Sequence, residues 1–168
     1  MAKPTIPSTL LCLLFISFTA SATIHDLLVS HGLPAGLLPK GVRSFSLDEA
    51  TGLLEVSFDA PCLARYENMV HFDRVVKGNL SSRGEFKGVE GLSQEELFLW
   101  FPIKKFVVGE PYEGMVLIDI GMAQKQVSVS LFEEPPECRP IEGGVNRDVK
   151  EAVELNAGRM EKGFEAQR

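Results

Sequence analysis

The sequence has few of the residues on which most catalytic and metal sites depend. Its 168 residues include three cysteines, three histidines and one tryptophan. It contains no Gly-x-Ser-x-Gly elbow, no glycine-rich loop ending in Gly-Lys-Ser/Thr, and no His-Glu-x-x-His zinc pair. Positive charge is also scarce, because 17 basic residues face 23 acidic ones and the net charge is −6. This balance argues against nucleic acid as a partner.

The length and composition are those of one soluble domain. A chain of 168 residues can bury a large core without a metal or several disulfides to hold it together. Apolar residues make up 45% and charged residues 24%, which excludes wholesale disorder, collagen-like repeats and a polytopic membrane protein.

The first 22 residues have the order of a secretory signal peptide. Lys3 provides a positive start, an apolar run covers residues 10–18, and the small residues of Ala20-Ser21-Ala22 form a cleavage site before Thr23. A membrane anchor is the alternative, but the apolar run is too short to span a bilayer of roughly 30 Å. We therefore expect a secreted or endomembrane protein without stable membrane insertion.

Cleavage removes Lys3 and Cys12, so the net charge becomes −7 and two cysteines remain. In an oxidising compartment Cys62 and Cys138 are expected to form a disulfide. The alternatives are two free buried thiols, or a catalytic cysteine paired with a histidine. Asn79-Leu80-Ser81 is an N-glycosylation sequon in a segment, 78–84, that has the composition of an exposed turn.

The mature chain alternates between apolar and polar residues in a way that predicts antiparallel strands. Residues 23–31 are expected to form a short helix that Thr23 caps, and the leucines of 32–39 should pin an irregular loop to the core. A hairpin is predicted over 42–58, and further one-sided strands over 69–76 and 127–131. The predicted fold is mainly β, an antiparallel barrel or sandwich with a short N-terminal helix.

Two predicted strands, Glu96–Phe101 and Met115–Ile120, are apolar on both faces. Such strands must be covered on both faces, by a second sheet, by the N-terminal helix or by an apolar ligand. Ordinary core packing is one interpretation. The other is an apolar ligand site, and its candidate contacts are Phe98, Trp100, Met115 and Leu117.

The segment 139–168 differs in composition from the rest. It has six basic and six acidic residues and a thin apolar stripe. This pattern predicts a charged, flexible or weakly helical tail that does not dock tightly, with a role in partner binding as the alternative. The chain thus divides into a signal peptide (1–22), a β-domain (23–138) and a tail (139–168).

Catalytic and metal-binding groups are weakly indicated. His25 and His31 lie on different sides of the predicted helix, so they cannot jointly bind a metal. His71 and Asp73 share one face of a strand and could orient a nearby serine, Ser81 or Ser82, but a polar pair on a solvated face is the simpler interpretation. We predict no catalytic residue, no cofactor and no metal site.

A series of short motifs follows the predicted helix. In chain order they are Gly32-Leu33-Pro34-Ala35-Gly36-Leu37-Leu38-Pro39-Lys40-Gly41-Val42, Thr51-Gly52, Cys62, Gly78, Gly88-Val89, Leu97-Phe98-Leu99-Trp100, Val108-Gly109, Phe132 and Pro136-Glu137-Cys138. Over about residues 23–138 this order resembles the plant family called domain of unknown function 538.

The resemblance implies a plant protein with an antiparallel β-barrel or sandwich. That family has been likened to lipid-binding folds of the bactericidal permeability-increasing type, and linked to stress responses and to trichome or cell-wall phenotypes. Hydrolase activity has been suggested for it without an accepted catalytic motif, so the resemblance supplies no catalytic residue. Cys62 and Cys138 match its cysteine positions, which supports the disulfide.

The expected function is that of a secreted, disulfide-closed domain that binds a lipid-like or amphipathic molecule and is not an enzyme. Its expected address is the apoplast, the cell wall or the endomembrane lumen. Two alternatives stay open: a weak ester hydrolase acting on wall or pigment substrates, and a structural module that binds a protein or cell-wall partner.

Overall fold

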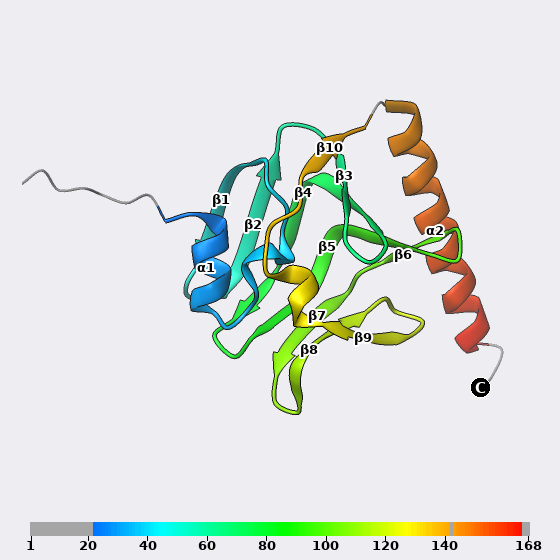
Figure 1. Ribbon diagram of the computed structural model, residues 1–168. Helices are drawn as coiled ribbons and strands as arrows, with labels where there is room; N and C mark the ends of the chain where they lie inside the picture. The colour runs from blue at the N-terminus through cyan, green and yellow to red at the C-terminus, as the bar shows by residue number, and fades with distance from the viewer. Residues whose placement is uncertain (1–21, 142, 166–168) are drawn as a thin grey trace, which may run out of the picture.

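The computed structural model describes residues 22–141 and 143–165, which form mainly antiparallel β-structure (Figure 1). The strands of the described chain are β1 (Val42–Asp48), β2 (Leu53–Phe58), β3 (Cys62–Arg65), β4 (Met69–Ser81), β5 (Glu85–Glu96), β6 (Leu99–Pro102), β7 (Lys105–Gly109), β8 (Tyr112–Asp119), β9 (Gln124–Ser128) and β10 (Cys138–Pro140). The helices are α1 (Ile24–Ser30) and α2 (Gly143–Glu165), with short 3-10 helices η1 (Ala35–Leu37) and η2 (Val129–Phe132).

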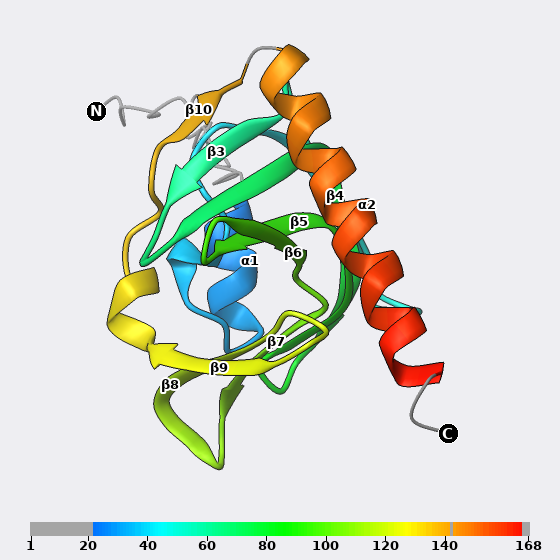
Figure 2. The ribbon, with the colours of Figure 1, turned by 90° about the vertical axis from the view of Figure 1, so that its right-hand side faces the viewer.

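One antiparallel sheet contains all of these strands. Its main path runs β1-β2-β4-β5-β7-β8-β9, while β3 lies between β4 and β10, and β6 pairs with the last part of β5. In the described chain β1 and β9 are not paired with each other, so the sheet stays open and curves around α1 as a sandwich-like structure (Figure 2). The prediction of a mainly β, antiparallel fold is confirmed.

The helix α1 forms where the sequence predicts it, because both of its ends are specified locally. The side chain of Thr23 accepts a hydrogen bond from the backbone N–H of Asp26, and the carboxylate of Asp26 accepts one from the N–H of Thr23 at 2.9 Å. The hydroxyl of Thr23 also donates to the Asp26 carboxylate at 2.6 Å, and this bond, followed by the one from the N–H of Thr23, lowers the pKa of Asp26 below its ordinary value. Ile24 and Leu28 are buried against the sheet.

The segment 32–39 is a loop held by its leucines, as predicted, with the short helix η1 inside it. Leu33, Leu37 and Leu38 are all buried in the core. Gly36 lies so close to the backbone after η2 that a Cβ atom there would be 2.6 Å from the carbonyl oxygen of Phe132. Only glycine fits at this contact between the two 3-10 helices.

The first predicted hairpin is confirmed, but the next strand is longer than predicted. Leu54, Val56 and Phe58 of β2 are buried in the core, while β1 is exposed on one face. β4 continues to Ser81, so Gly78 lies inside the strand and the turn begins only after it. Gly78 is needed there because a Cβ atom would be 2.6 Å from the ring of Phe86.

Two predicted strands differ in the structure. Residues 127–131 were expected to be one strand, but β9 ends at Ser128 and η2 follows, beginning where the side chain of Ser128 accepts a hydrogen bond from the N–H of Ser130. The segment predicted as one strand over Glu96–Phe101 is instead a hairpin: β5 ends at Glu96, Leu97 and Phe98 form the turn, and β6 begins at Leu99.

Within the predicted tail, Gly143–Glu165 form one long helix, α2, that packs against β6 (Figure 2). Val149 and Asn156 are buried, and Lys150 forms an ion pair with Asp73 of β4 at 2.9 Å. The tail was predicted to be weakly helical and not to dock tightly, and residues 149–156 of α2 contact the sheet at these positions. Among the described residues this contact includes the ion pair of Lys150, a hydrogen bond from Asn156 to the carbonyl of Trp100 and the buried Val149, and a search for an apolar stripe underestimates the polar part.

Candidate functional site

The turn between β5 and β6 exposes the most apolar surface of the described chain. Leu97 and Phe98 are 88% and 92% exposed, and Leu99, the first residue of β6, is 46% exposed. We call these three residues the hairpin tip. In Figure 1 it lies at the right-hand edge of the sheet. Soluble proteins rarely expose adjoining apolar side chains to this extent unless the surface binds something.

The backbone of the tip is also unusual. Leu97 and Phe98 both adopt positive φ, 50° and 66°. Two-residue hairpin turns of this kind strongly favour Asn-Gly or Asp-Gly, because the left-handed region costs other residues roughly 1–2 kcal/mol each. Large apolar residues therefore occupy positions that neither solvation nor backbone conformation favours, which is typical of a functional constraint.

A polar network fixes the base of the hairpin. One carboxylate oxygen of Glu96, the last residue of β5, accepts hydrogen bonds from the side-chain amides of Asn68 and Gln94, each at 2.8 Å. The ammonium group of Lys125 on β9 donates to the same oxygen and also pairs with Glu67 at 3.4 Å. We call these five residues the Glu96 network. It ties the tip to the β3–β4 turn and to β9, so the tip is held from three elements.

Trp100 connects the tip to the face covered by α2. Its ring contacts the imidazole of His71 edge to face, with the ring centroids 6.3 Å apart. Its backbone carbonyl accepts a hydrogen bond from the side-chain amide of Asn156 on α2 at 2.8 Å. Trp100 is partly buried.

The structure does not join the four predicted apolar contacts into one site. Phe98 is at the tip and Trp100 beside it, but Met115 and Leu117 lie on β8. Leu117 lies opposite Val107 of β7, and Val107 lies opposite Glu85, the first residue of β5. The tip follows the last residue of β5, so Leu117 is near the other end of that strand. Leu117 is buried and Met115 partly buried, both on the face of β8 that points away from the main core.

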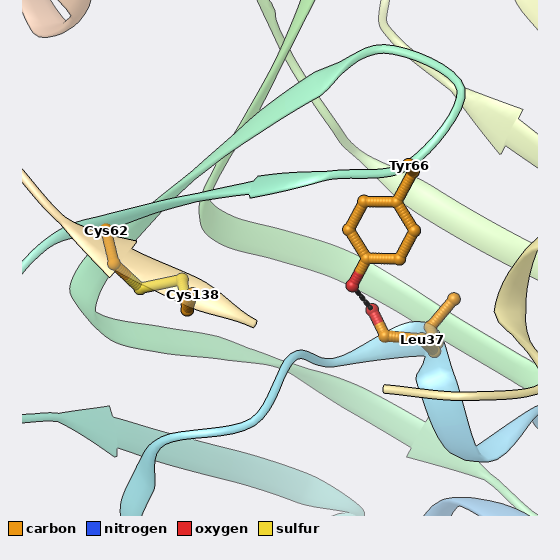
Figure 3. The surroundings of a disulfide bond; sticks show 4 residues. All are labelled: Leu37, Cys62, Tyr66 and Cys138. Carbon is orange, nitrogen blue, oxygen red and sulfur yellow. Dashed lines mark hydrogen bonds between the residues drawn. A yellow bond between two sulfur atoms is a disulfide. The ribbon is translucent and has the colours of Figure 1, made fainter. Parts of the chain in front are cut away.

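The interior next to the Glu96 network is filled. A cavity of only about 20 Å³ remains there, enough for about one water molecule. Tyr66 helps to close it: its hydroxyl donates to the carbonyl of Leu37 at 3.2 Å (Figure 3). Its ring packs on that of Phe132. Burial raises the pKa of this hydroxyl. A lipid-sized molecule therefore has no room in this cavity.

A second group of polar residues lies under α2. His71 is buried on the face of β4 opposite the core, and Ser93 of β5 stands across from it in the strand register. Asp73 pairs with Lys150 of α2, and a groove of about 320 Å³ lies between the helix and this part of the sheet. The groove begins at a bulge in β4, where Gly91 of β5 leaves room for the backbone of the bulge.

The serines suggested by the sequence are not part of that group. Ser81 is at the other end of β4 from His71 and pairs with Glu85, and Ser82 follows it. An arrangement of His71 and Asp73 with either serine is therefore not formed. Ser93 was missed because it is adjacent to His71 only through strand pairing.

Two further predicted groups have clear positions. Cys62 of β3 and Cys138 of β10 form a disulfide, with Cα atoms 5.4 Å apart (Figure 3). Asn79 is exposed on β4, and its side-chain amide donates to the carbonyl of Thr51 at 2.5 Å. The predicted signal peptide lies outside the described residues except for Ala22, which precedes the capping residue Thr23.

The described chain contains no cluster of three or more potential metal ligands. The first two histidines instead bond to the backbone: Nδ1 of His25 lies 2.9 Å from the carbonyl of Ala35, and Nδ1 of His31 lies 2.9 Å from that of Leu27. Of the helices in the described residues, none has the length and apolar character needed to cross a membrane.

Comparison with protein families assigns the chain to one of them. The model of the family described as protein of unknown function, DUF538, matches residues 24–133, and the chain belongs to this family. The match includes β1 to β9 and ends within the segment that leads to β10, so α2 lies beyond it. Comparisons with the curated proteins and with the solved structures give no significant match.

Proposed function

We propose that this protein is a secreted, non-catalytic domain that binds a lipid-like or amphipathic molecule through the hairpin tip. The observation that carries the proposal is the near-complete exposure of Leu97 and Phe98 in a backbone conformation that disfavours them. Covering a large apolar side chain with an apolar ligand gives roughly 1.5–3 kcal/mol relative to leaving it in water. That gain offsets the cost of exposing the tip in the free protein.

The surroundings of the tip support binding at this place. The Glu96 network holds the base of the hairpin, so little order has to be gained when a ligand arrives. Trp100, next to the tip, offers a ring with an apolar body and a polar N–H, which suits the boundary between an apolar ligand and water.

Secretion is proposed on the signal-peptide pattern of residues 1–22, together with the disulfide between Cys62 and Cys138. We further propose that Asn79 carries a glycan and that the protein acts in stress responses or in the cell wall or epidermis of a plant. Expression in a plant secretory host tests the address: the mature chain should begin at Thr23, and Asn79→Gln should remove any glycan mass.

The single tryptophan allows a direct binding test. Lysophosphatidylcholine is titrated into the purified mature protein while the emission of Trp100 is recorded. A shift to shorter wavelength that saturates is expected, and Phe98→Ser should abolish it or require at least about tenfold more ligand.

Leu53→Ser is the matched control. Leu53, like Phe98, is an exposed apolar residue, with 46% of its surface accessible, but it lies on β2 away from the tip. It should bind like the wild type. If Phe98→Ser and Leu53→Ser both bind as the wild type does, the tip is not the binding site. Organic extraction of protein from the plant host, followed by mass spectrometry, tests in parallel whether a natural amphiphile remains bound.

A further inference from the structure

Building on the binding function proposed above, we infer that the hairpin tip inserts into an assembled, zwitterionic or uncharged lipid surface and does not enclose a single lipid molecule. Phosphatidylcholine is the representative lipid of this class. The shape of the site and the charges around it both lead to this conclusion.

The tip is convex. A site for one small molecule is normally a cavity of roughly 300–1,000 Å³ that surrounds most of the ligand. Here the cavity beside the Glu96 network holds about 20 Å³, whereas Leu97 and Phe98 point almost wholly into solvent. One lipid molecule could cover such a tip only in part. In an assembled surface, many acyl chains surround the inserted side chains at once.

The charges near the tip are unsuited to an anionic surface. Glu95 and Glu96 directly precede it, and Glu67 lies in the same network. Lys125, the cation of that network, is already paired with Glu96 and Glu67. Anionic membranes attract proteins through clusters of unpaired lysine and arginine, and the chain as a whole carries a net charge of −6. Apolar insertion is therefore the source of affinity, and electrostatic attraction to lipid phosphate is not.

The backbone conformation of the tip also favours insertion into a lipid surface. Side chains on a two-residue turn diverge from the end of the hairpin, so Leu97 and Phe98 reach outward beyond the paired strands. Their attachment to the Glu96 network keeps them there. A rigid apolar wedge with an adjacent tryptophan is the geometry with which a protein rests at a lipid–water boundary.

Flotation of vesicles with the full mature protein tests the inference. The protein should float with phosphatidylcholine vesicles, and added salt should not release it. Replacing part of the phosphatidylcholine by phosphatidylglycerol should leave binding unchanged or weaker. Leu97→Ser/Phe98→Ser should lower the bound fraction roughly tenfold or more, and Leu53→Ser should not.

A second titration separates this inference from the proposed function. Dihexanoylphosphatidylcholine is added below its micelle-forming concentration, so that it is present only as monomers. Saturable binding of monomers with no flotation overturns the lipid-surface inference and leaves the binding function standing. Flotation that needs phosphatidylglycerol and is lost in salt also overturns it. Absence of binding to monomers, to lysophosphatidylcholine and to vesicles removes the binding function as well.

Discussion

The side-chain amide of Asn156 on α2 donates a hydrogen bond to the backbone carbonyl of Trp100 on β6, at 2.8 Å. β6 pairs with β5 on one side only, so this carbonyl belongs to an otherwise open edge of the sheet. Exposed edges invite pairing with other chains, and a covering helix is one way to prevent it. Asn156 therefore links α2 to β6, the edge strand on the C-terminal side of the hairpin turn.

Replacing Asn156 by alanine should loosen α2 without unfolding the domain. The variant leaves the partly covered carbonyl of Trp100 without its partner. This should weaken the docking of α2 by about 1 kcal/mol. Hydrogen exchange of the amides in residues 149–156 should accelerate several-fold. Leu155→Ala is the control, because Leu155 directly precedes Asn156 in α2 and its side chain is 66% exposed. Equal exchange rates in the two variants would show that Asn156 does not hold the helix.

Replacing Glu96 by alanine should destabilise the whole domain. Three donors, from Asn68, Gln94 and Lys125, lose their shared acceptor, and Gln94 is buried. We expect a loss of about 2–3 kcal/mol in the free energy of unfolding, because buried donors left without partners carry the full cost of desolvation. Urea denaturation measures it as a lower midpoint with an unchanged slope.

Glu95→Ala is the matched variant for that measurement. Glu95 precedes Glu96 on β5 and makes no side-chain hydrogen bond or ion pair among the described residues. Its removal should change the free energy of unfolding by less than about 0.5 kcal/mol. A similar loss in both variants would mean that general strand effects, and not the network, hold the base of the hairpin.

The sequence predicts those elements whose causes lie within a few residues. α1 is specified by its capping box, and the β1–β2 hairpin by strict alternation around the turn before Gly52. β4 was predicted to end at residue 76 because the segment 78–84, with Gly78, Asn79 and Ser81, has the composition of a turn, whereas the strand continues to Ser81. Its continuation depends on the pairing with β5, which no local pattern encodes.

The candidate site was predicted only in part, for a related reason. The run Leu97-Phe98-Leu99-Trp100 consists of residues that favour strands, and nothing in it resembles the Asn-Gly pair that usually marks a two-residue turn. Phe98 and Trp100 were singled out as contacts on one strand, but Phe98 lies in the turn and Trp100 on β6, the strand that follows it. The Glu96 network was missed entirely, since it joins residues from Glu67 to Lys125 that approach one another only in the folded sheet.

Removing the disulfide should lower stability substantially. Cys62 and Cys138 are 76 positions apart, and a loop of this length is worth about 4 kcal/mol in the chain-entropy description. Cys62→Ala/Cys138→Ala should therefore unfold at much lower urea concentration than the wild type. Non-reducing mass spectrometry of the wild type should find the two peptides linked. Free thiols at both positions in protein from the secretory pathway would contradict the disulfide.

Replacing Gly36 by alanine should be costly although it adds one methyl group. The new Cβ atom would be 2.6 Å from the carbonyl oxygens of both Phe132 and Glu134, and both are backbone atoms that cannot rotate away. We expect a loss of about 1–3 kcal/mol, the usual range for overpacking, measured by urea denaturation. Gly158→Ala in α2 is the control, because a Cβ atom there meets nothing within 4 Å and alanine favours a helix. Gly158→Ala should keep or slightly raise stability. Equal midpoints for the two variants would show that η1 and η2 can separate without cost, and that the leucine loop is not packed as tightly as the structure shows.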